Sequence, residues 1–184
     1  IYKVSPDEVT ELMRGQAKAV NFGIIYGKTE FSLAKDLGIS RKEAKEIIES
    51  YLNEYPNIRG YMYNIVESAK ENGYVKTLFG RIRYIKELSD RNYNIRQFGE
   101  RIALNTPIQG TAADIIKIAM VNVAERLKKE LPEAYLVLQI HDELIIEAKP
   151  EDKEKAGQIL KECMESAVKL NVPLTAPVEY SYSL

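Results

Sequence analysis

The chain has 184 residues, 45% of them hydrophobic, which is enough for one domain or two small lobes with an apolar core. Its net charge of −1 does not by itself point to nucleic acid, and a single cysteine, Cys163, excludes an internal disulfide. No apolar run approaches the length of a membrane span, and residues 1–20 lack the layout of a signal peptide, so we expect a soluble, intracellular protein.

Helical signals fill the first 72 residues. Cap residues and apolar residues at helical spacing predict helices over about 10–24, 29–37, 40–56 and 56–71. Ser40 and Glu43, three residues apart, form a capping box, and Gly38 and Gly73 are suited to end the helices that precede them. We therefore expect a helical N-terminal lobe.

The rest of the chain mixes helices with short strands. GYVKTLFGRIRYI, residues 73–85, alternates well enough for a β-hairpin that turns near Gly80. A helix that begins at Asn94 should be interrupted at Thr106-Pro107, after which the longest apolar stripe of the sequence predicts a second helix. The other expected elements are a polar loop over 86–92, strands over 134–140, 143–148 and 178–182, and a charged amphipathic helix over 150–170. This mixture predicts an α+β fold in two lobes, with a small antiparallel sheet flanked by long helices.

An acidic pair interrupts the predicted strand pair. LVLQIHDELIIEA, residues 136–148, places His141, Asp142 and Glu143 between two apolar runs. Ionised carboxylates are costly to desolvate, and a chain reversal would expose them while the flanking residues anchor the sheet. Asp142 is then suited to hold a hard cation such as Mg²⁺, which takes one or two carboxylates together with substrate phosphates. A plain polar hairpin turn fits the same residues, and the tripeptide alone does not decide.

Cations and aromatic rings share one face of the first long helix. In RGQAKAVNFGIIYG, Arg14, Lys18, Phe22 and Tyr26 recur every fourth position and form one slowly winding stripe. Such a stripe can meet a nucleotide, with charge for the phosphates and rings for the base and sugar. It also fits a half-buried helix with its rings in the core and its cations in water.

Three segments, taken together and in order, resemble motif B, the glutamine-helix motif and motif C of family A DNA polymerases, the DNA polymerase I type. They are RGQAKAVNFGIIYG, LNTPIQGTAAD and LQIHDEL, and GYVKTLFGRIRYI between them also matches the family's pattern. The resemblance covers essentially all 184 residues. It implies that residues 1–72 are fingers helices. It also implies that residues 73–184 are the C-terminal portion of the palm, with a small hairpin, the glutamine helix, the HDE hairpin, and a last helix and strand.

The resemblance implies template-directed transfer of a nucleotide from dNTP to a primer 3′ end. Arg14 and Lys18 would hold the triphosphate, and Lys18 would also serve as general acid toward the pyrophosphate. Phe22 would pack near the sugar. Tyr26 would stack at the templating position and leave it when the fingers close.

The resemblance also implies a magnesium site and a duplex-binding surface. Asp142 would be one of two aspartates that bridge two Mg²⁺ ions, Glu143 a nearby supporting carboxylate, and His141 a neighbour of the primer terminus. Arg81 and Arg83 are candidates for contacts with the DNA backbone. Minor-groove hydrogen-bond acceptors are common to every base pair, so a near-neutral chain can bind DNA locally and without sequence preference. The residues implied in such contacts with the template–primer duplex are Arg101, Asn105, Gln109 and Gln139.

Two features depart from the family's pattern. Gly15 stands where the family usually has a second arginine, which removes a cation and weakens the helix by about 0.5–1 kcal/mol relative to alanine. Reduced nucleotide affinity is therefore expected. No segment like DYSQIELR, the motif A that carries the first aspartate, occurs in the chain. Because Asp142 alone should not hold both ions in register, we expect this chain to be inactive by itself.

The family's thumb and exonuclease regions and the end of its C-terminal tail are also missing from this sequence. The expected partners are therefore template–primer DNA, dNTP and the missing N-terminal polymerase half, in cis or as a second chain, in the cytoplasm at the nucleoid. Three readings stay open: part of a polymerase that is split or continuous, a non-catalytic module that binds template–primer or nucleotide, and an interaction protein whose motifs are relics.

Overall fold

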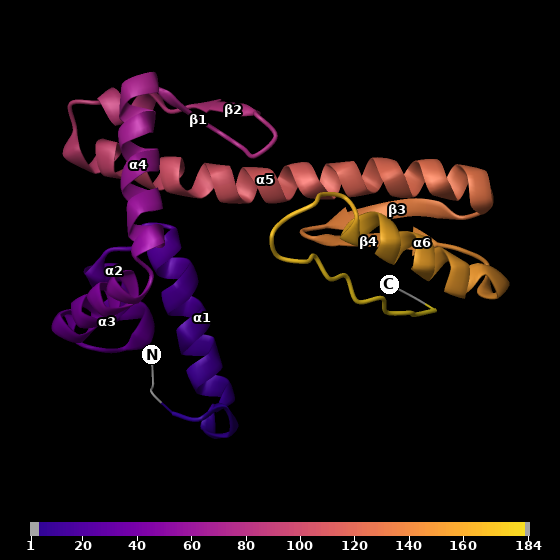
Figure 1. Ribbon diagram of the computed structural model, residues 1–184, viewed down its shortest axis with the longest axis horizontal. Coiled ribbons are helices and arrows are strands. Elements are labelled where there is room, and N and C mark those ends of the chain that lie inside the picture. The colour runs from indigo at the N-terminus through magenta and orange to yellow at the C-terminus, as the bar shows by residue number, and fades with distance from the viewer. Residues whose placement is uncertain (1–3, 183–184) are drawn as a thin grey trace. The chain divides into compact units, whose positions relative to one another are not determined.

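The computed structural model describes residues 4–182. The described chain is mostly helical and contains two small antiparallel sheets, so the predicted α+β class is confirmed. The chain divides into two compact units at Gly110/Thr111. Of the helices in the described range, none is both long enough and apolar enough to cross a membrane. The elements (Figure 1) are η1 (Pro6–Glu8), α1 (Glu11–Ile25), α2 (Glu30–Leu37), α3 (Arg41–Glu54), α4 (Pro56–Asn72), β1 (Tyr74–Lys76), β2 (Ile82–Tyr84), η2 (Lys86–Ser89), α5 (Tyr93–Glu130), β3 (Tyr135–Ile140), β4 (Glu143–Glu147), η3 (Pro150–Asp152) and α6 (Lys153–Glu165).

The first three α-helices begin at the side-chain caps that the sequence predicts. Thr10 and Thr29 each accept the backbone N–H of the residue three positions on, at 3.2 and 3.3 Å. Ser40 and Glu43 form the predicted capping box at the start of α3. Each cap satisfies a donor that the first turn would otherwise leave unpaired, a contribution of about 1 kcal/mol. The three helices bury a common apolar cluster made of Val20, Ile24, Leu33, Ala34 and Ala44.

α4 leads into the first hairpin. It ends at Gly73, whose φ of 76° is open to glycine without a Cβ penalty. β1 and β2 then pair as the predicted antiparallel hairpin, and Val75 lies opposite Arg83. The predicted polar loop over 86–92 contains the short helix η2, whose Leu88 is buried. A second cluster joins these elements to the start of α5 through Ala69, Val75, Ile85, Leu88 and Ala103.

This second cluster lies across the predicted lobe boundary. Ala69 precedes residue 72, and Val75 and Ile85 follow it, yet all three pack together. By compactness the chain divides instead at Gly110/Thr111. The assignment of residues 1–72 and 73–184 to separate functional parts stays a prediction.

The predicted break at Thr106-Pro107 is wrong, because α5 continues through it as one helix. A proline inside a helix removes one backbone hydrogen bond and costs about 3 kcal/mol. Side chains bond to the helix backbone on either side of the proline. The Thr106 hydroxyl donates to the Ile102 carbonyl at 2.7 Å, and Arg81 of the β1–β2 hairpin donates to the Gly110 carbonyl at 2.9 Å. The break was expected from local preference alone, and the helix continues in spite of it.

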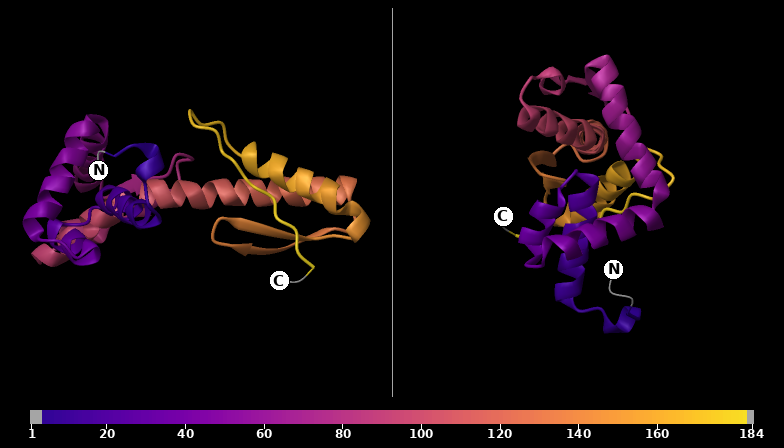
Figure 2. Two further views of the ribbon diagram at one scale, coloured as in Figure 1. Left: turned by 90° about the horizontal axis from the view of Figure 1, so that it is seen from below. Right: turned by 90° about the vertical axis from the view of Figure 1, so that its left-hand side faces the viewer.

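The C-terminal unit packs the second hairpin and α6 along the later part of α5 (Figures 1 and 2). β3 and β4 are antiparallel, and their bounds agree with the prediction to within one residue. The three elements enclose one core, whose buried members are Ala119, Val123, Leu127, Leu131, Ala134, Leu144, Ala156, Ile159 and Cys163. The register shifts between Leu136 and Leu138, and large apolar side chains of β3 stay exposed, namely Tyr135, Val137, Leu138 and Ile140.

Two predictions at the C-terminal end are wrong. The helix expected to reach residue 170 ends at Glu165, and no strand forms over residues 178–182. The segment packs on α6 instead. The Ala176 N–H donates to Glu165, and Tyr180 lies against Gly157, where a Cβ would come within 2.4 Å of the Tyr180 hydroxyl. A β-branched, aromatic stretch becomes a strand only beside an available edge, and here a helix surface holds it.

Candidate functional site

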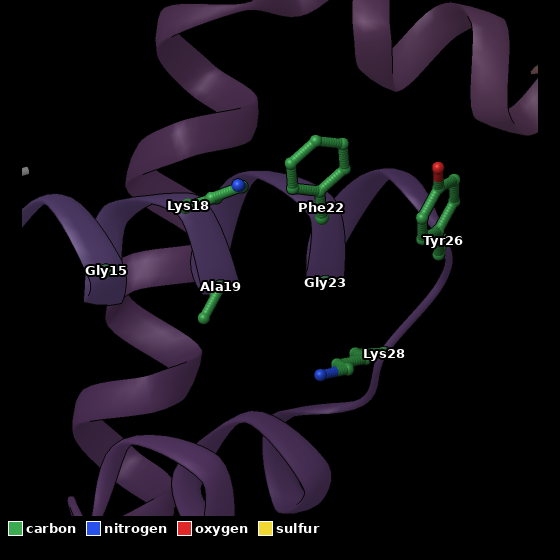
Figure 3. Close-up of a pocket in the computed structure, with 7 residues that line it drawn as sticks. All are labelled: Gly15, Lys18, Ala19, Phe22, Gly23, Tyr26 and Lys28. Carbon is green, nitrogen blue, oxygen red and sulfur yellow. The ribbon is translucent and has the colours of Figure 1, made fainter. Parts of the chain in front are cut away.

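A shallow groove of about 320 Å³ lies against α1 and the turn that follows it (Figure 3). Lys18, Phe22 and Tyr26 line it, so the structure brings three of the four predicted nucleotide ligands to one surface. The remaining lining residues are Gly15, Ala19, Gly23 and Lys28. Arg14 lies one turn before Lys18 and is exposed, but it is not among the described residues that line the groove.

The aromatic side chains of the groove are open to solvent. Phe22 is 46% exposed, and its ring centroid lies 6.0 Å from that of Tyr26. In Figure 3, Lys18, Phe22 and Tyr26 project on one side of the α1 ribbon, away from Ala19 and Lys28. The reading that buries these rings in the core is therefore wrong for Phe22. A cation and two accessible rings on one side of a helix suit a ligand with phosphates and a flat, apolar part.

The turn after α1 joins the groove to α5. Tyr26 ends the helix, and its N–H donates to the Phe22 carbonyl at 3.0 Å. Gly27 has a φ of 74°, and a Cβ there would lie 2.8 Å from Leu104 and 3.4 Å from Arg101. Only glycine fits both the backbone conformation and the close approach. The turn next to Tyr26 therefore lies against the part of α5 that carries Arg101.

Lys28 is a groove residue that the sequence reasoning missed. Its backbone N–H donates to the Gly23 carbonyl at 2.8 Å, and its side chain passes over Gly23, where a Cβ would lie 3.0 Å from its Cδ. Its ammonium pairs with Asp36 of α2 at 2.5 Å. Lys28 lies outside the four-residue repeat that marked the other groove residues. The signal that could have found it is the small residue Gly23, which leaves room for a neighbouring side chain.

The predicted duplex contacts on α5 lie on one helical face, because Arg101, Asn105 and Gln109 are four residues apart. Arg101 and Asn105 are half-buried and Gln109 is exposed. The Arg101 guanidinium lies 5.8 Å from the Phe98 ring centroid. The side-chain oxygen of Asn105 is buried and has no hydrogen-bond partner among residues 4–182.

Both arginines of the first hairpin reach α5. Arg81 donates to the Gly110 carbonyl at 2.9 Å, and Arg83 donates to the Thr106 hydroxyl at 3.3 Å. These contacts were not foreseen. The sequence suggested the DNA backbone as the partner of both side chains, and the structure shows a protein partner for each.

The acidic turn joins β3 to β4, as predicted. His141 and Asp142 form a two-residue connection between Ile140 and Glu143. His141 has a φ of 53°, unusual for a residue with a Cβ, and its carbonyl accepts from the Gln139 amide at 2.5 Å. All of these side chains are exposed, so the carboxylates are not desolvated.

The donor set at this turn fits a single Mg²⁺ better than two. Asp142 and Glu143 supply hard, exposed oxygen ligands, and Mg²⁺ is commonly held by one or two carboxylates together with substrate phosphates. Within residues 4–182, no three His, Cys, Asp or Glu side chains gather closely enough to share a metal. Lys18 and Asp142 belong to different compact units, so their convergence on one ligand stays a prediction.

A family model described as DNA polymerase family A matches residues 1–183. The chain belongs to DNA polymerase family A. DNA polymerase I of Bacillus caldotenax is 55% identical over 182 residues, which are 99% of this chain and 20% of that protein. DNA polymerase I of Bacillus subtilis (strain 168) is 53% identical over 174 residues, 95% of this chain and 20% of that protein. The chain thus spans about one fifth of the length of these curated relatives.

A solved member of the family shares the fold. The POL domain of Pol1 from M. smegmatis, in complex with DNA primer–template and dNTP, matches with a TM-score of 0.90 and 41% identity. The match covers 94% of this chain and 30% of that one. The predicted family is confirmed, and the roles of the individual residues stay predictions.

Proposed function

We propose that this chain is the nucleotide-binding and primer-terminus part of a DNA-directed DNA polymerase. The observation that carries the proposal is the groove in which Lys18, Phe22 and Tyr26 meet, in a chain of DNA polymerase family A. In this proposal residues 1–72 serve as fingers and residues 73–184 as the C-terminal part of the palm. The likeness to a polymerase domain in complex with primer–template and dNTP supports it.

The groove binds the incoming dNTP. The Lys18 ammonium and the Arg14 guanidinium pair with the triphosphate, and charge-assisted hydrogen bonds of this kind are roughly twice as strong as neutral ones. The Phe22 ring lies against the sugar, and Tyr26 occupies the templating position until the helix closes over the nucleotide. Lys18 then gives a proton to the departing pyrophosphate, which neutralises the charge that develops there.

The acidic turn serves the reacting phosphate. Asp142 and Glu143 would hold Mg²⁺, which, when bound, neutralises phosphate charge and lowers the pKa of an attacking hydroxyl. Two-metal transfer needs a further aspartate, and the chain contains no segment like DYSQIELR. Synthesis therefore requires the N-terminal polymerase half, attached or as a second chain.

The duplex is held from the minor groove. Arg101, Asn105 and Gln109 present donors from one face of α5, and Gln139 and His141 lie at the acidic turn. The acceptors that they meet recur at every base pair, so the contact is independent of sequence. A net charge of −1 is compatible with such local contacts.

Primer extension tests the proposal directly. The chain is assayed with Mg²⁺, primer–template and dNTP, alone and mixed with a fragment that carries the thumb and motif A. Synthesis in the mixture alone supports the proposal. Synthesis by the isolated chain contradicts the need for a second aspartate. Retained DNA binding without synthesis in either assay favours a non-catalytic module, and absence of both favours an interaction protein.

Gly15 offers a second test of the groove. A Cβ at this position meets nothing within 4 Å, so Gly15→Arg can restore the usual cation without a clash. We expect the dNTP KM of the complemented enzyme to fall, because a further positive charge then lies beside the triphosphate. Gly15→Gln, which adds length without charge, is the matched control. An unchanged KM and turnover for Gly15→Arg would count against a phosphate at this end of α1.

A further inference from the structure

The β1–β2 hairpin bonds to α5 on both sides of Pro107 through Arg81 and Arg83, and we call this pair of contacts the grip. Arg83 donates to the hydroxyl of Thr106, the residue before the proline, at 3.3 Å. Arg81 donates to the carbonyl of Gly110, three residues after it, at 2.9 Å. All these residues belong to the N-terminal unit.

The segment of α5 between these contacts lacks one helix hydrogen bond. Pro107 has no N–H, so the Ala103 carbonyl, four residues earlier, loses its usual partner. Helices commonly kink at such positions. Thr106 is 8% exposed and donates to Ile102 at 2.7 Å, so its hydroxyl joins Arg83 to the helix backbone.

Gly110 lets the hairpin come this close. A Cβ at Gly110 would lie 2.7 Å from the Thr77 methyl group, well inside normal contact. Thr77 is 7% exposed and is itself fixed. Its N–H donates to the Arg81 carbonyl at 2.9 Å, and its hydroxyl accepts the Arg81 N–H at 3.2 Å. The backbone that carries Arg81 is therefore held in place before the guanidinium reaches α5.

We propose that Thr77, Arg81 and Arg83 are positioning residues that hold α5 across Pro107 and so direct Gln109. Gln109 lies between the two gripped positions, Thr106 and Gly110, and its own side chain is exposed. The arginines thus act on the duplex through α5, not through phosphates of their own. The part of this inference that concerns DNA rests on the proposed function.

Amide hydrogen exchange tests the grip without DNA. Arg81→Met and Arg83→Met keep the side-chain length and remove the donors. We expect exchange of the backbone amides over residues 108–114 to become about tenfold faster, the size of effect expected for a lost hydrogen bond from a charged group. Arg81→Lys, which keeps a cationic donor, should restore most of the protection. Arg91→Met, a change at another exposed arginine of the same unit, is the control and should leave these amides unchanged.

Duplex binding tests the consequence for Gln109. Affinity for primer–template is measured over a range of salt for the chain with its complementing fragment, for Arg81→Met, Gln109→Ala and the double variant. Because Arg81 acts through Gln109, we expect Arg81→Met to weaken binding about tenfold, with an unchanged salt slope and little further loss in the double variant. Additive losses and a salt slope smaller by about one would show a direct phosphate contact instead and overturn the inference.

The two measurements separate the inference from the proposed function. Unchanged exchange in Arg81→Met and Arg83→Met overturns the grip, whatever the binding data show. Faster exchange in a chain whose parent binds no duplex, even when complemented, supports the grip and contradicts the proposed function. Gly110→Ala provides an independent variant. If the hairpin packs as described, it should accelerate exchange in both the hairpin and residues 108–114, because the Cβ separates them.

Discussion

The groove on α1 and the turn between β3 and β4 carry the predicted nucleotide and metal ligands, and the fold supports them differently. Lys18, Phe22 and Tyr26 stand on a capped helix that buries Val20 and Ile24 on another face. The acidic turn projects exposed side chains from a two-residue connection. The groove residues are thus positioned by burial elsewhere on the same helix, whereas the turn is positioned by the backbone pairing of β3 with β4 and by the bond from Gln139 to the His141 carbonyl.

This difference predicts different responses to substitution. A helix face fixed by a buried stripe presents its side chains in register before a ligand arrives, so each groove residue should contribute a graded share of binding. An exposed carboxylate gains a defined position from the ion and phosphate that it binds. Its loss should therefore remove the reaction and leave the fold unchanged.

Asp142→Ala gives the largest expected effect. Synthesis by the complemented enzyme should fall by roughly a hundredfold to a thousandfold, the range seen when one group that stabilises transition-state charge is removed. Thermal unfolding should not change, because the side chain is exposed. Glu147→Gln, at the far end of β4, is the matched control and should keep full activity. Surviving synthesis in Asp142→Ala would remove the acidic turn from the reaction.

Lys18→Met should weaken the groove by less. Loss of a charge-assisted hydrogen bond to phosphate corresponds to roughly a tenfold to hundredfold loss in kcat/KM for dNTP. Affinity for primer–template without dNTP should stay within about twofold, since Lys18 lies on the nucleotide side. Lys35→Met, which removes an exposed cation of α2, controls for net charge. Equal losses in the two variants would mean that charge acts only at long range.

Gly15 on α1 and Gly27 in the turn after it should respond in opposite ways to substitution by alanine. Gly27→Ala should destabilise the chain by about 1–3 kcal/mol, because φ is 74° and the new Cβ would lie 2.8 Å from Leu104. Gly15→Ala should stabilise it by about 0.5–1 kcal/mol, because the position is helical and a Cβ there has open space. Urea unfolding of both variants measures the contrast. Equal shifts for the two would show that the contact between the turn and α5 contributes nothing to stability.

The smallest expected effect concerns the ion pairs of Arg126, near the C-terminal end of α5. Arg126 donates to Glu130 at 2.8 Å and to Glu162 at 2.6 Å, and these bonds hold the pKa of both carboxyls below the ordinary value of 4.5. Because the folded pKa lies below the unfolded one, the ion pairs stabilise the chain fully above that value. The stabilisation disappears as pH falls through the lowered pKa.

Arg126→Met should therefore lower the urea midpoint near neutral pH, and its effect should shrink as the pH falls through the lowered pKa of the two carboxyls. The shift should be small, because all three side chains are partly exposed to solvent. Lys128→Met, two residues further along the same helix, is the control for charge. A difference between wild type and Arg126→Met that persists unchanged in acid would mean that the arginine acts by packing of its stem.

Local signals account for what the sequence predicted well. Thr10, Ser40 and Gly73 act within a few residues of their own position, and the helix ends that they predicted agree with the structure. The groove followed in the same way, since a four-residue spacing is enough to place Lys18, Phe22 and Tyr26 together. Arg14, one turn before Lys18, is not among the residues that line the groove.

What the sequence did not predict depends on contacts between distant segments. Pro107 stays inside a helix, and residues of the first hairpin, more than twenty positions earlier, bond to the helix on either side of it. Residues 178–182 form no strand, because α6 offers Tyr180 a place beside Gly157. Lys28 enters the groove through a pairing with Asp36 and through the space over Gly23. In the first two cases the partners lie too far away in sequence to leave a local pattern.

The exposed apolar side chains of β3 should affect the solubility of the isolated chain. Tyr135, Leu138 and Ile140 are exposed on a short sheet, and such an apolar surface favours association with a strand of another molecule. Preparations of the isolated chain should self-associate as concentration rises. Loss of soluble material on storage would then reflect this uncovered surface and not a failure to fold.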